Sequence, residues 1–166
     1  MITRRTIGIW GVGLVALGML AAAHSFERLL GLDPCLLCLR QRESYWVVLT
    51  FAALGMVLAK IRPRRVETAQ AFVGLGLVHG LSMAGFHVGV EQGWWPGPAA
   101  CSAGAANLSG LDLTTALDAP VRAPSCADIA WQFLGLSMAA WNAIVLVGLL
   151  AFVGVRLYDL HHHDRS

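Results

Sequence analysis

Four long apolar runs, almost free of charged residues, alternate with shorter polar stretches along the chain. They cover residues 7–24, 43–60, 68–90 and 129–155. A helix needs roughly 20 apolar residues to cross the hydrocarbon core of a bilayer, with a range of about 17 to 25. Each run can therefore cross once, and the second does so most easily if its helix begins near Pro34. The pattern predicts an all-α membrane protein, a single domain built as a bundle of four transmembrane helices.

The composition agrees with this interpretation. Of the 166 residues, 57% are hydrophobic and only 13% are charged, and the mean hydropathy is +0.63. Soluble domains carry about 25% charged residues, so a soluble fold is disfavoured. The sequence has no Gly-rich phosphate loop, no GxSxG and no HExxH, which leaves nucleotide-dependent and hydrolytic mechanisms without support.

Lysine and arginine are distributed unequally between the two sides of the predicted membrane. Four crossings place both termini and the middle loop on one side, and the loops 25–42 and 91–128 on the other. The first side carries eight basic residues: Arg4, Arg5, Lys60, Arg62, Arg64, Arg65, Arg156 and Arg165. The second side carries four: Arg28, Arg40, Arg42 and Arg122. The positive-inside rule then predicts cytoplasmic termini, and all four cysteines fall in the two outward loops, which face the periplasm in a bacterium.

Two cysteines, Cys35 and Cys38, stand at the predicted start of the second helix. Asp33 is suited to cap the helix, and Pro34 suits its first position, where no N–H is needed. The two cysteines then share one face of the first turns, and the positive end of the helix favours a thiolate. This placement is typical of reactive cysteines.

The second outward loop contains Cys101 and Cys126, flanked by prolines and glycines, and its composition predicts a mobile, externally presented segment. Three interpretations compete for the four cysteines. A zinc site has only half of its ligand pattern, because no second CxxC or HxxxH follows, so no metal is predicted. Structural disulfides suit the compartment, but a Cys35–Cys38 ring constrains the unfolded chain very little. Two redox-active pairs working in series give each pair a separate role.

Two further residues are candidates for the same site. Arg42 follows Cys38 by about one helical turn and can stabilise a thiolate or donate to a quinone carbonyl; the alternative is an anchor at the headgroups. His87, near the outer end of the third run, can exchange a proton with a quinone oxygen or simply bond between helices. His79, deeper in that run, is expected to join two helices, and the tryptophans to anchor the interface or wall a pocket.

With these motifs in order, the chain resembles the bacterial disulfide bond formation protein B family, DsbB. The resemblance rests on Pro34-Cys35-Leu36-Leu37-Cys38 followed by Arg42, on His87 ahead of the second loop, and on Cys101 with Cys126. Its most specific part is Trp131-Gln132-Phe133-Leu134-Gly135-Leu136 with Met138 and Trp141. One departure is Glu91, four residues after His87, where the best-known member has a glutamine.

The resemblance implies an enzyme of the inner membrane, a protein-disulfide:quinone oxidoreductase. It implies that a periplasmic thioredoxin-fold oxidase of the DsbA type attacks Cys101 in a Cys101–Cys126 disulfide. Cys126 would then attack Cys35, and Cys38 would reduce ubiquinone, or menaquinone in its place, held near Arg42 and His87. Two alternatives are an enzyme like vitamin K epoxide reductase, whose CxxC belongs to a later helix, and a membrane scaffold with static disulfides.

Overall fold

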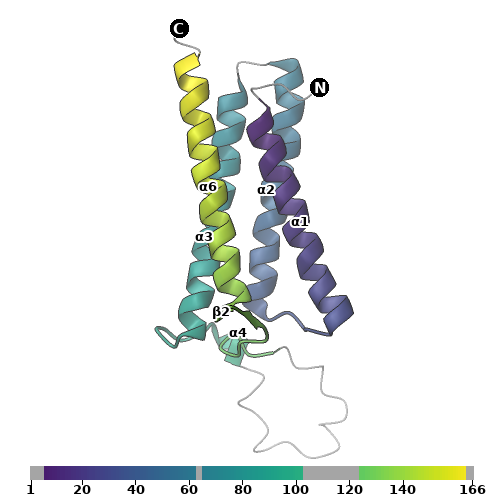
Figure 1. The fold of residues 1–166 in the computed structure, drawn as a ribbon, viewed down its shortest axis with the longest axis vertical. Coiled ribbons are helices and arrows are strands. Elements are labelled where there is room, and N and C mark those ends of the chain that lie inside the picture. The colour runs from purple at the N-terminus through teal and green to yellow at the C-terminus, as the bar shows by residue number, and fades with distance from the viewer. Residues whose placement is uncertain (1–5, 63–64, 103–123, 164–166) are drawn as a thin grey trace, which may run out of the picture.

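In a computed structural model, the chain forms a bundle of four long helices with a small cap at one end (Figure 1). The structure describes residues 6–62, 65–102 and 124–163. The long helices are α1 (Ile7–Leu30), α2 (Leu36–Ile61), α3 (Val66–Glu91) and α6 (Met138–His163). The cap consists of the short helix α4 (Ala99–Ser102) and the strands β1 (Gln132–Phe133) and β2 (Leu136–Ser137). All four long helices are long and apolar enough to cross a membrane, which confirms the predicted fold class.

Helix α3 lies between α2 and α6, and α1 packs mainly against α2. Gly76 and Gly80 allow α3 to approach α2 closely, because a Cβ added there would lie 3.0 Å from Val48 and 3.3 Å from Ser44. Small residues at such contacts are typical of helix packing in membranes, where there is little hydrophobic drive between helices. The chain starts α1 and ends α6 at the same end of the bundle, and the cap lies at the other end (Figure 1).

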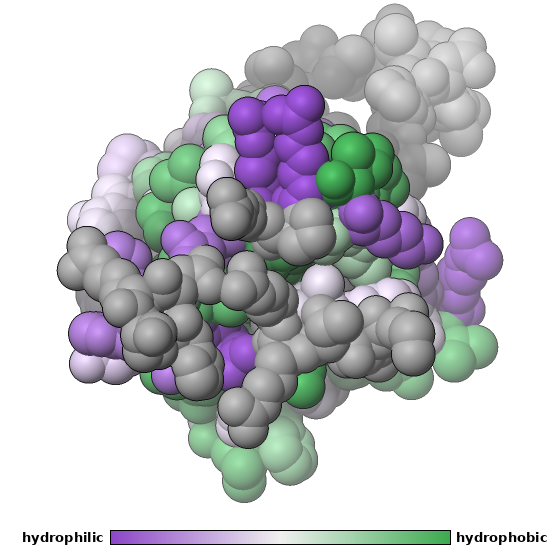
Figure 2. Space-filling view, turned by 90° about the horizontal axis from the view of Figure 1, so that it is seen from above, coloured by the Kyte–Doolittle hydropathy of each residue, from purple (hydrophilic) through white to green (hydrophobic). Residues whose placement is uncertain are grey.

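Seen from the end that carries the termini, the bundle shows hydrophilic side chains on this face and apolar ones at its sides (Figure 2). The apolar sides are made by exposed residues of the long helices, such as Leu14, Leu54, Leu75 and Val147. A belt of exposed apolar side chains between polar ends is the surface that a bilayer requires.

The predicted outward loop 25–42 is wrong at its start, because helix α1 continues to Leu30. Helix α2 begins at Leu36, close to the start expected near Pro34, so only a short link separates the two helices. The charges of Glu27 and Arg28 end the apolar run but not the helix, since a helix satisfies its own backbone beyond the hydrocarbon. What ends α1 is Gly31, whose left-handed φ of 65° closes the last turn with an N–H bonded to the carbonyl of Phe26.

The predicted start of the fourth helix at residue 129 is also wrong. Strands β1 and β2 occupy part of this stretch as a tight hairpin, turned by Leu134 and Gly135 with φ of 54° and 77°. Helix α6 then begins at Met138, with the Ser137 hydroxyl accepting from the N–H of Ala140 at 3.1 Å. An apolar run does not by itself distinguish a short hairpin from a helix, which explains the error.

Candidate functional site

The first turn of α2 is capped by a cysteine. Cys35 is the N-cap, with extended backbone angles, and its Sγ accepts a hydrogen bond from the N–H of Cys38 at 3.2 Å. The prediction that Asp33 caps the helix and Pro34 opens it is therefore wrong, because the helix starts two residues later. A sulfur in the capping position lies against the positive end of the helix, where negative charge is stabilised.

Cys35 and Cys38 are free thiols with their sulfurs 2.8 Å apart. Cys35 is buried and Cys38 is half-buried. The hydrogen bond from Cys38 lowers the pKa of the Cys35 thiol well below its usual range; burial opposes this effect, and a hydrogen bond from His87 supports it. Cys35 is therefore the thiolate of the pair when both are reduced.

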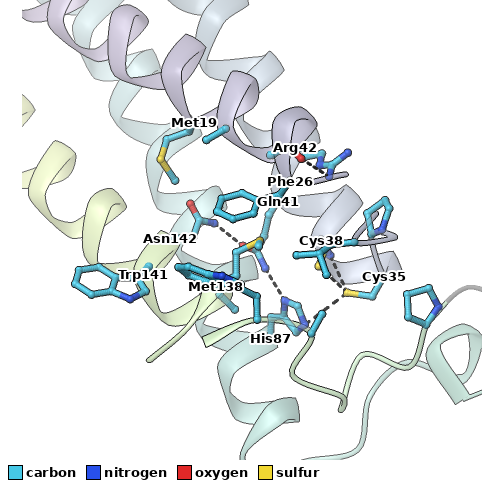
Figure 3. A pocket seen from close by; sticks show the side chains of 18 of the residues that line it. Met19, Phe26, Cys35, Cys38, Gln41, Arg42, His87, Met138, Trp141 and Asn142 are labelled. Atoms are coloured by element: carbon cyan, nitrogen blue, oxygen red, sulfur yellow. Dashed lines mark hydrogen bonds between the residues drawn. The ribbon is translucent and has the colours of Figure 1, made fainter. Parts of the chain in front are cut away.

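His87 connects the cysteine pair to the interior of the bundle (Figure 3). Its Nε2 lies 3.6 Å from the Sγ of Cys35 and 3.8 Å from a carboxylate oxygen of Glu91. Its Nδ1 lies 2.8 Å from the Nε2 of Gln41. The second oxygen of Glu91 accepts from the Ser137 hydroxyl, so the side chain of Glu91, only 5% exposed, has a partner on each oxygen.

A line of buried polar side chains continues from His87 into the bundle (Figure 3). Gln41 accepts at Oε1 from the Nδ2 of Asn142, and Asn142 accepts at Oδ1 from the hydroxyl of Tyr45, each at 2.5 Å. The four side chains come from α2, α3 and α6 and are all buried. We call Tyr45, Asn142, Gln41 and His87 the polar chain.

Arg42 lies beside the cysteines but makes its hydrogen bonds elsewhere. One guanidinium nitrogen is 2.5 Å from a carboxylate oxygen of Glu27 on α1, and another donates to the carbonyl of Ala23 at 3.2 Å. The ion pair crosses between α1 and α2 and is only half-buried. It holds the guanidinium at the edge of a cavity that Cys38 also lines.

That cavity has a volume of about 410 Å³ and opens between α1, α2, α3, α6 and the cap. Its walls are mainly apolar and include Met19, Leu20, Phe26, Trp131, Met138 and Trp141. The polar groups Cys35, Cys38, Gln41, Arg42, His87 and Asn142 also line it (Figure 3). A ring with two carbonyl oxygens fits such walls, because the apolar surface takes the ring and the donors take an oxygen.

The second cysteine pair forms a disulfide, Cys101–Cys126, with the two Cα atoms 5.4 Å apart. Both cysteines are buried, 6% and 0% exposed, and pack in one cluster with Cys35, Leu37 and Val90. The prediction that Cys101 is externally presented is wrong for this arrangement, since α4 folds against the ends of α2 and α3. Residues 103–123, the centre of the predicted loop 91–128, lie outside the described residues.

Three possible metal ligands meet at the inner pair. The Sγ atoms of Cys35 and Cys38 and a ring nitrogen of His87 lie within 4.8 Å of one another. The spacing of the cysteines alone does not indicate this histidine as a third donor. Two sulfurs and an imidazole are ligands that Zn²⁺ accepts, so the expectation of no metal stays a prediction.

Several other predicted roles have clear outcomes. His79 bonds to the Ser44 hydroxyl at 3.0 Å, which confirms a contact between α2 and α3. Trp131 and Trp141 wall the cavity. Arg40 pairs with Glu43 on the exposed face of α2.

Four residues of the site were not predicted from the sequence: Glu27, Gln41, Tyr45 and Asn142. Asn142 is the one amide or charged residue between Met138 and Val155, and its isolation among apolar neighbours was an available signal. Gln41 stands between Arg40 and Arg42 and carries no such signal.

Comparisons with known proteins agree with the motifs. The sequence model of the family "Disulfide bond formation protein DsbB" matches residues 5–156. A disulfide bond formation protein B of Xanthomonas axonopodis pv. citri (strain 306) is 32% identical over 161 residues, covering 90% of this chain and 91% of that protein. Proteins of the same name are 33% identical in Xanthomonas euvesicatoria pv. vesicatoria (strain 85-10), covering 82% of this chain and 80% of that protein, and 30% identical in Shewanella sp. (strain MR-4), covering 83% and 81%.

Proposed function

The chain belongs to the family of disulfide bond formation protein DsbB, and from this premise we propose that it is a protein-disulfide:quinone oxidoreductase. It takes electrons from a soluble thioredoxin-fold oxidase of the DsbA type and passes them to ubiquinone or menaquinone. The observation that carries the proposal is the position of Cys35 and Cys38 on the wall of the apolar cavity, beside Arg42.

The two pairs divide the electron transfer into two exchanges. A thiolate of the partner attacks Cys101, the Cys101–Cys126 bond breaks, and Cys126 leaves as a thiolate; the second thiol of the partner then completes the partner's own disulfide. The Cys126 thiolate attacks Cys35 of an oxidised inner pair, and Cys38 leaves. Burial of Cys35, Cys101 and Cys126 in one cluster supports direct exchange between the pairs.

Attack of the released Cys101 thiolate on Cys126 then restores the outer disulfide and leaves Cys35 reduced as a thiolate and Cys38 reduced as a thiol. The pair loses two electrons and the proton of Cys38 as its disulfide re-forms. A bound quinone would supply the oxidising power by accepting both electrons, together with the proton of Cys38 and one proton from water. Cys38 and the guanidinium of Arg42 lie on the cavity wall, and the Cys35 thiolate carries the charge of the reduced pair. The apolar walls exclude water from the sulfurs.

The location proposed is the bacterial inner membrane, with cytoplasmic termini and the cysteine end in the periplasm. The excess of lysine and arginine at the end with the termini supports this orientation. A reporter fused after Ser166 should be active only in the cytoplasm. A periplasmic signal would contradict the orientation.

The direct test mixes purified protein in nanodiscs with ubiquinone and a reduced thioredoxin-fold oxidase, and follows quinone absorbance. One quinone should be reduced for each partner disulfide formed. A Cys101→Ser variant is the control, because it should stop electron entry while a reduced inner pair still reduces one equivalent of quinone. Absence of quinone reduction by the wild-type protein would overturn the proposal.

A further inference from the structure

We propose that Tyr45, Asn142 and Gln41 are positioning residues that hold His87 in one tautomer, with its proton on Nε2 facing Cys35. The proposal rests on the proposed function only in taking Cys35 as a working thiol. The polar chain would thereby orient the imidazole that donates a hydrogen bond to the Cys35 thiolate.

The hydrogen bonds between Tyr45, Asn142 and Gln41 all run in one direction, toward His87. The hydroxyl of Tyr45 donates to the Oδ1 of Asn142. The amide of Asn142 then presents its nitrogen to Gln41, and the hydrogen bond from Asn142 Nδ2 to Gln41 Oε1 follows. Each amide has one accepting end and one donating end, so the orientation of one fixes the orientation of the next.

Gln41 transmits this direction to the imidazole ring. With its oxygen facing Asn142, Gln41 points its amide nitrogen at the Nδ1 of His87, 2.8 Å away. An amide nitrogen only donates, so Nδ1 must accept. A neutral imidazole that accepts at Nδ1 carries its proton on Nε2.

The Nε2 of His87 faces groups that can accept a hydrogen bond. Cys35 Sγ is 3.6 Å away and Glu91 Oε1 is 3.8 Å away, and these are its ionisable neighbours, with the backbone of Cys126 also interacting with the ring. Cys35 precedes α2, and Glu91 lies on α3 one turn beyond His87. A fixed Nε2–H therefore donates to the Cys35 thiolate rather than removing a proton from the thiol.

The groups around Nε2 keep the direction of the polar chain from reversing, because reversal would turn an unprotonated Nε2 toward Cys35 and Glu91, which are acceptors. Gln41 is 8% exposed, Asn142 6%, Tyr45 4% and His87 3%. Turning over Gln41 alone would set two donors face to face, and turning over Asn142 alone would set two acceptors face to face, which is costly among buried groups. His87 thus stabilises Cys35 as the thiolate leaving group when Cys101 attacks Cys126 of the mixed Cys35–Cys126 disulfide, and a better leaving group speeds thiol–disulfide exchange.

The test compares substitutions at two buried glutamines. Gln41→Met removes the donor to His87 at nearly constant volume, and Gln41→Glu replaces that donor by an acceptor. The matched control is Gln70→Met: Gln70 on α3 is also buried, and both its amide atoms lack a hydrogen-bond partner among the described residues. Melting temperature in nanodiscs identifies any variant that does not fold.

The first readout is the pH profile of Cys35 alkylation in the reduced protein, located by mass spectrometry. Gln41→Met should move the midpoint to higher pH by about one unit, so that alkylation below the midpoint is about tenfold slower. Gln70→Met should leave the profile unchanged. An unchanged profile in folded Gln41→Met would overturn the proposal.

The second readout is ¹⁵N NMR of histidine-labelled protein, with the His87 signals assigned by comparison with a His87→Gln variant. The wild-type ring should carry its proton on Nε2, and Gln41→Glu should protonate Nδ1. A proton on Nδ1 in the wild-type protein would overturn the proposal. Neither readout needs quinone. A failure of quinone reduction would therefore overturn the proposed function, while the two readouts would still test the position of the proton on His87.

Discussion

Two buried glutamines, Gln41 at the cysteine end and Gln70 in the half that carries the termini, show how differently the two regions treat a polar side chain. Gln41 bonds to His87 and Asn142, which extend the polar chain on either side. Gln70 is fully buried, and neither its nitrogen nor its oxygen has a hydrogen-bond partner in the part of the chain that the structure describes.

The surroundings of the two glutamines differ in the same way. Around Gln70 the core is aliphatic, with Ile9, Val73 and Val153 among its residues. Around Gln41 the helices leave a cavity into which sulfur, imidazole and amide groups point. One half of the bundle is packed for stability, and the other gives up packing to assemble reactive groups, so substitutions in the two halves should change different properties.

The largest effect is expected from Cys38→Ser. A serine cannot form the inner disulfide, so steady quinone reduction should fall to the uncatalysed background. The partner should still be oxidised once by Cys101–Cys126, which quantitative thiol trapping measures. Steady turnover by Cys38→Ser would show that the cysteine end is not the redox centre.

Arg42→Ala should raise the apparent KM for quinone by about tenfold or more, because a charge-assisted hydrogen bond is worth roughly 1.5–3 kcal/mol. Exchange between Cys101 and the partner should be unchanged. Initial rates at varied quinone concentration check the first expectation, and stopped-flow mixing with reduced partner checks the second. Arg40→Ala, on the same helix but paired with Glu43 on an exposed face, is the matched control.

The pH dependence of stability should differ between the reduced protein and Cys35→Ser. The pKa of Cys35 is lowered in the fold, chiefly by the hydrogen bond from Cys38. The thiolate therefore stabilises the reduced fold above the ordinary thiol pKa of about 8.5, and this contribution is lost as pH falls through the lowered pKa. The melting temperature of the reduced wild-type protein should exceed that of the variant most at alkaline pH, and the gap should narrow on acidification. A gap that widens instead would contradict this sign.

The smallest effect is expected at Gln70. Gln70→Met removes a buried amide that has no hydrogen-bond partner among the residues the structure describes, and it should raise the free energy of unfolding by about 1 kcal/mol. Unfolding of nanodisc samples in denaturant, followed by tryptophan fluorescence, measures the change. Quinone reduction should stay at the wild-type rate. A loss of stability would show that this half also depends on its polar groups.

Much of the fold could be predicted from the pattern of apolar residues alone. The third helix was placed within two residues at each end, because its apolar run coincides with the helix. The start of α6 was not predicted correctly, because the hairpin before it lies in the same apolar run as the helix. The link between α1 and α2 was overestimated, because charged residues mark where the lipid ends and not where the helix ends.

Part of the candidate site was equally predictable. Cys35, Cys38 and Arg42 follow one another at helical spacing, so one helix brings them together. Gln41 and Asn142 are 101 positions apart, and no local pattern indicates that they meet. Glu27 joins Arg42 from another helix in the same way.

The sequence by itself determined the membrane character, the four helices and the cysteine motif, because lipid solubility and helical spacing depend on residues near one another in the chain. Only the tertiary structure decided that Cys35 caps its own helix, that His87 reaches it, and that three helices align donors and acceptors into the polar chain. Hydrogen-bond direction passes from side chain to side chain through space, and it exists only once the helices are packed.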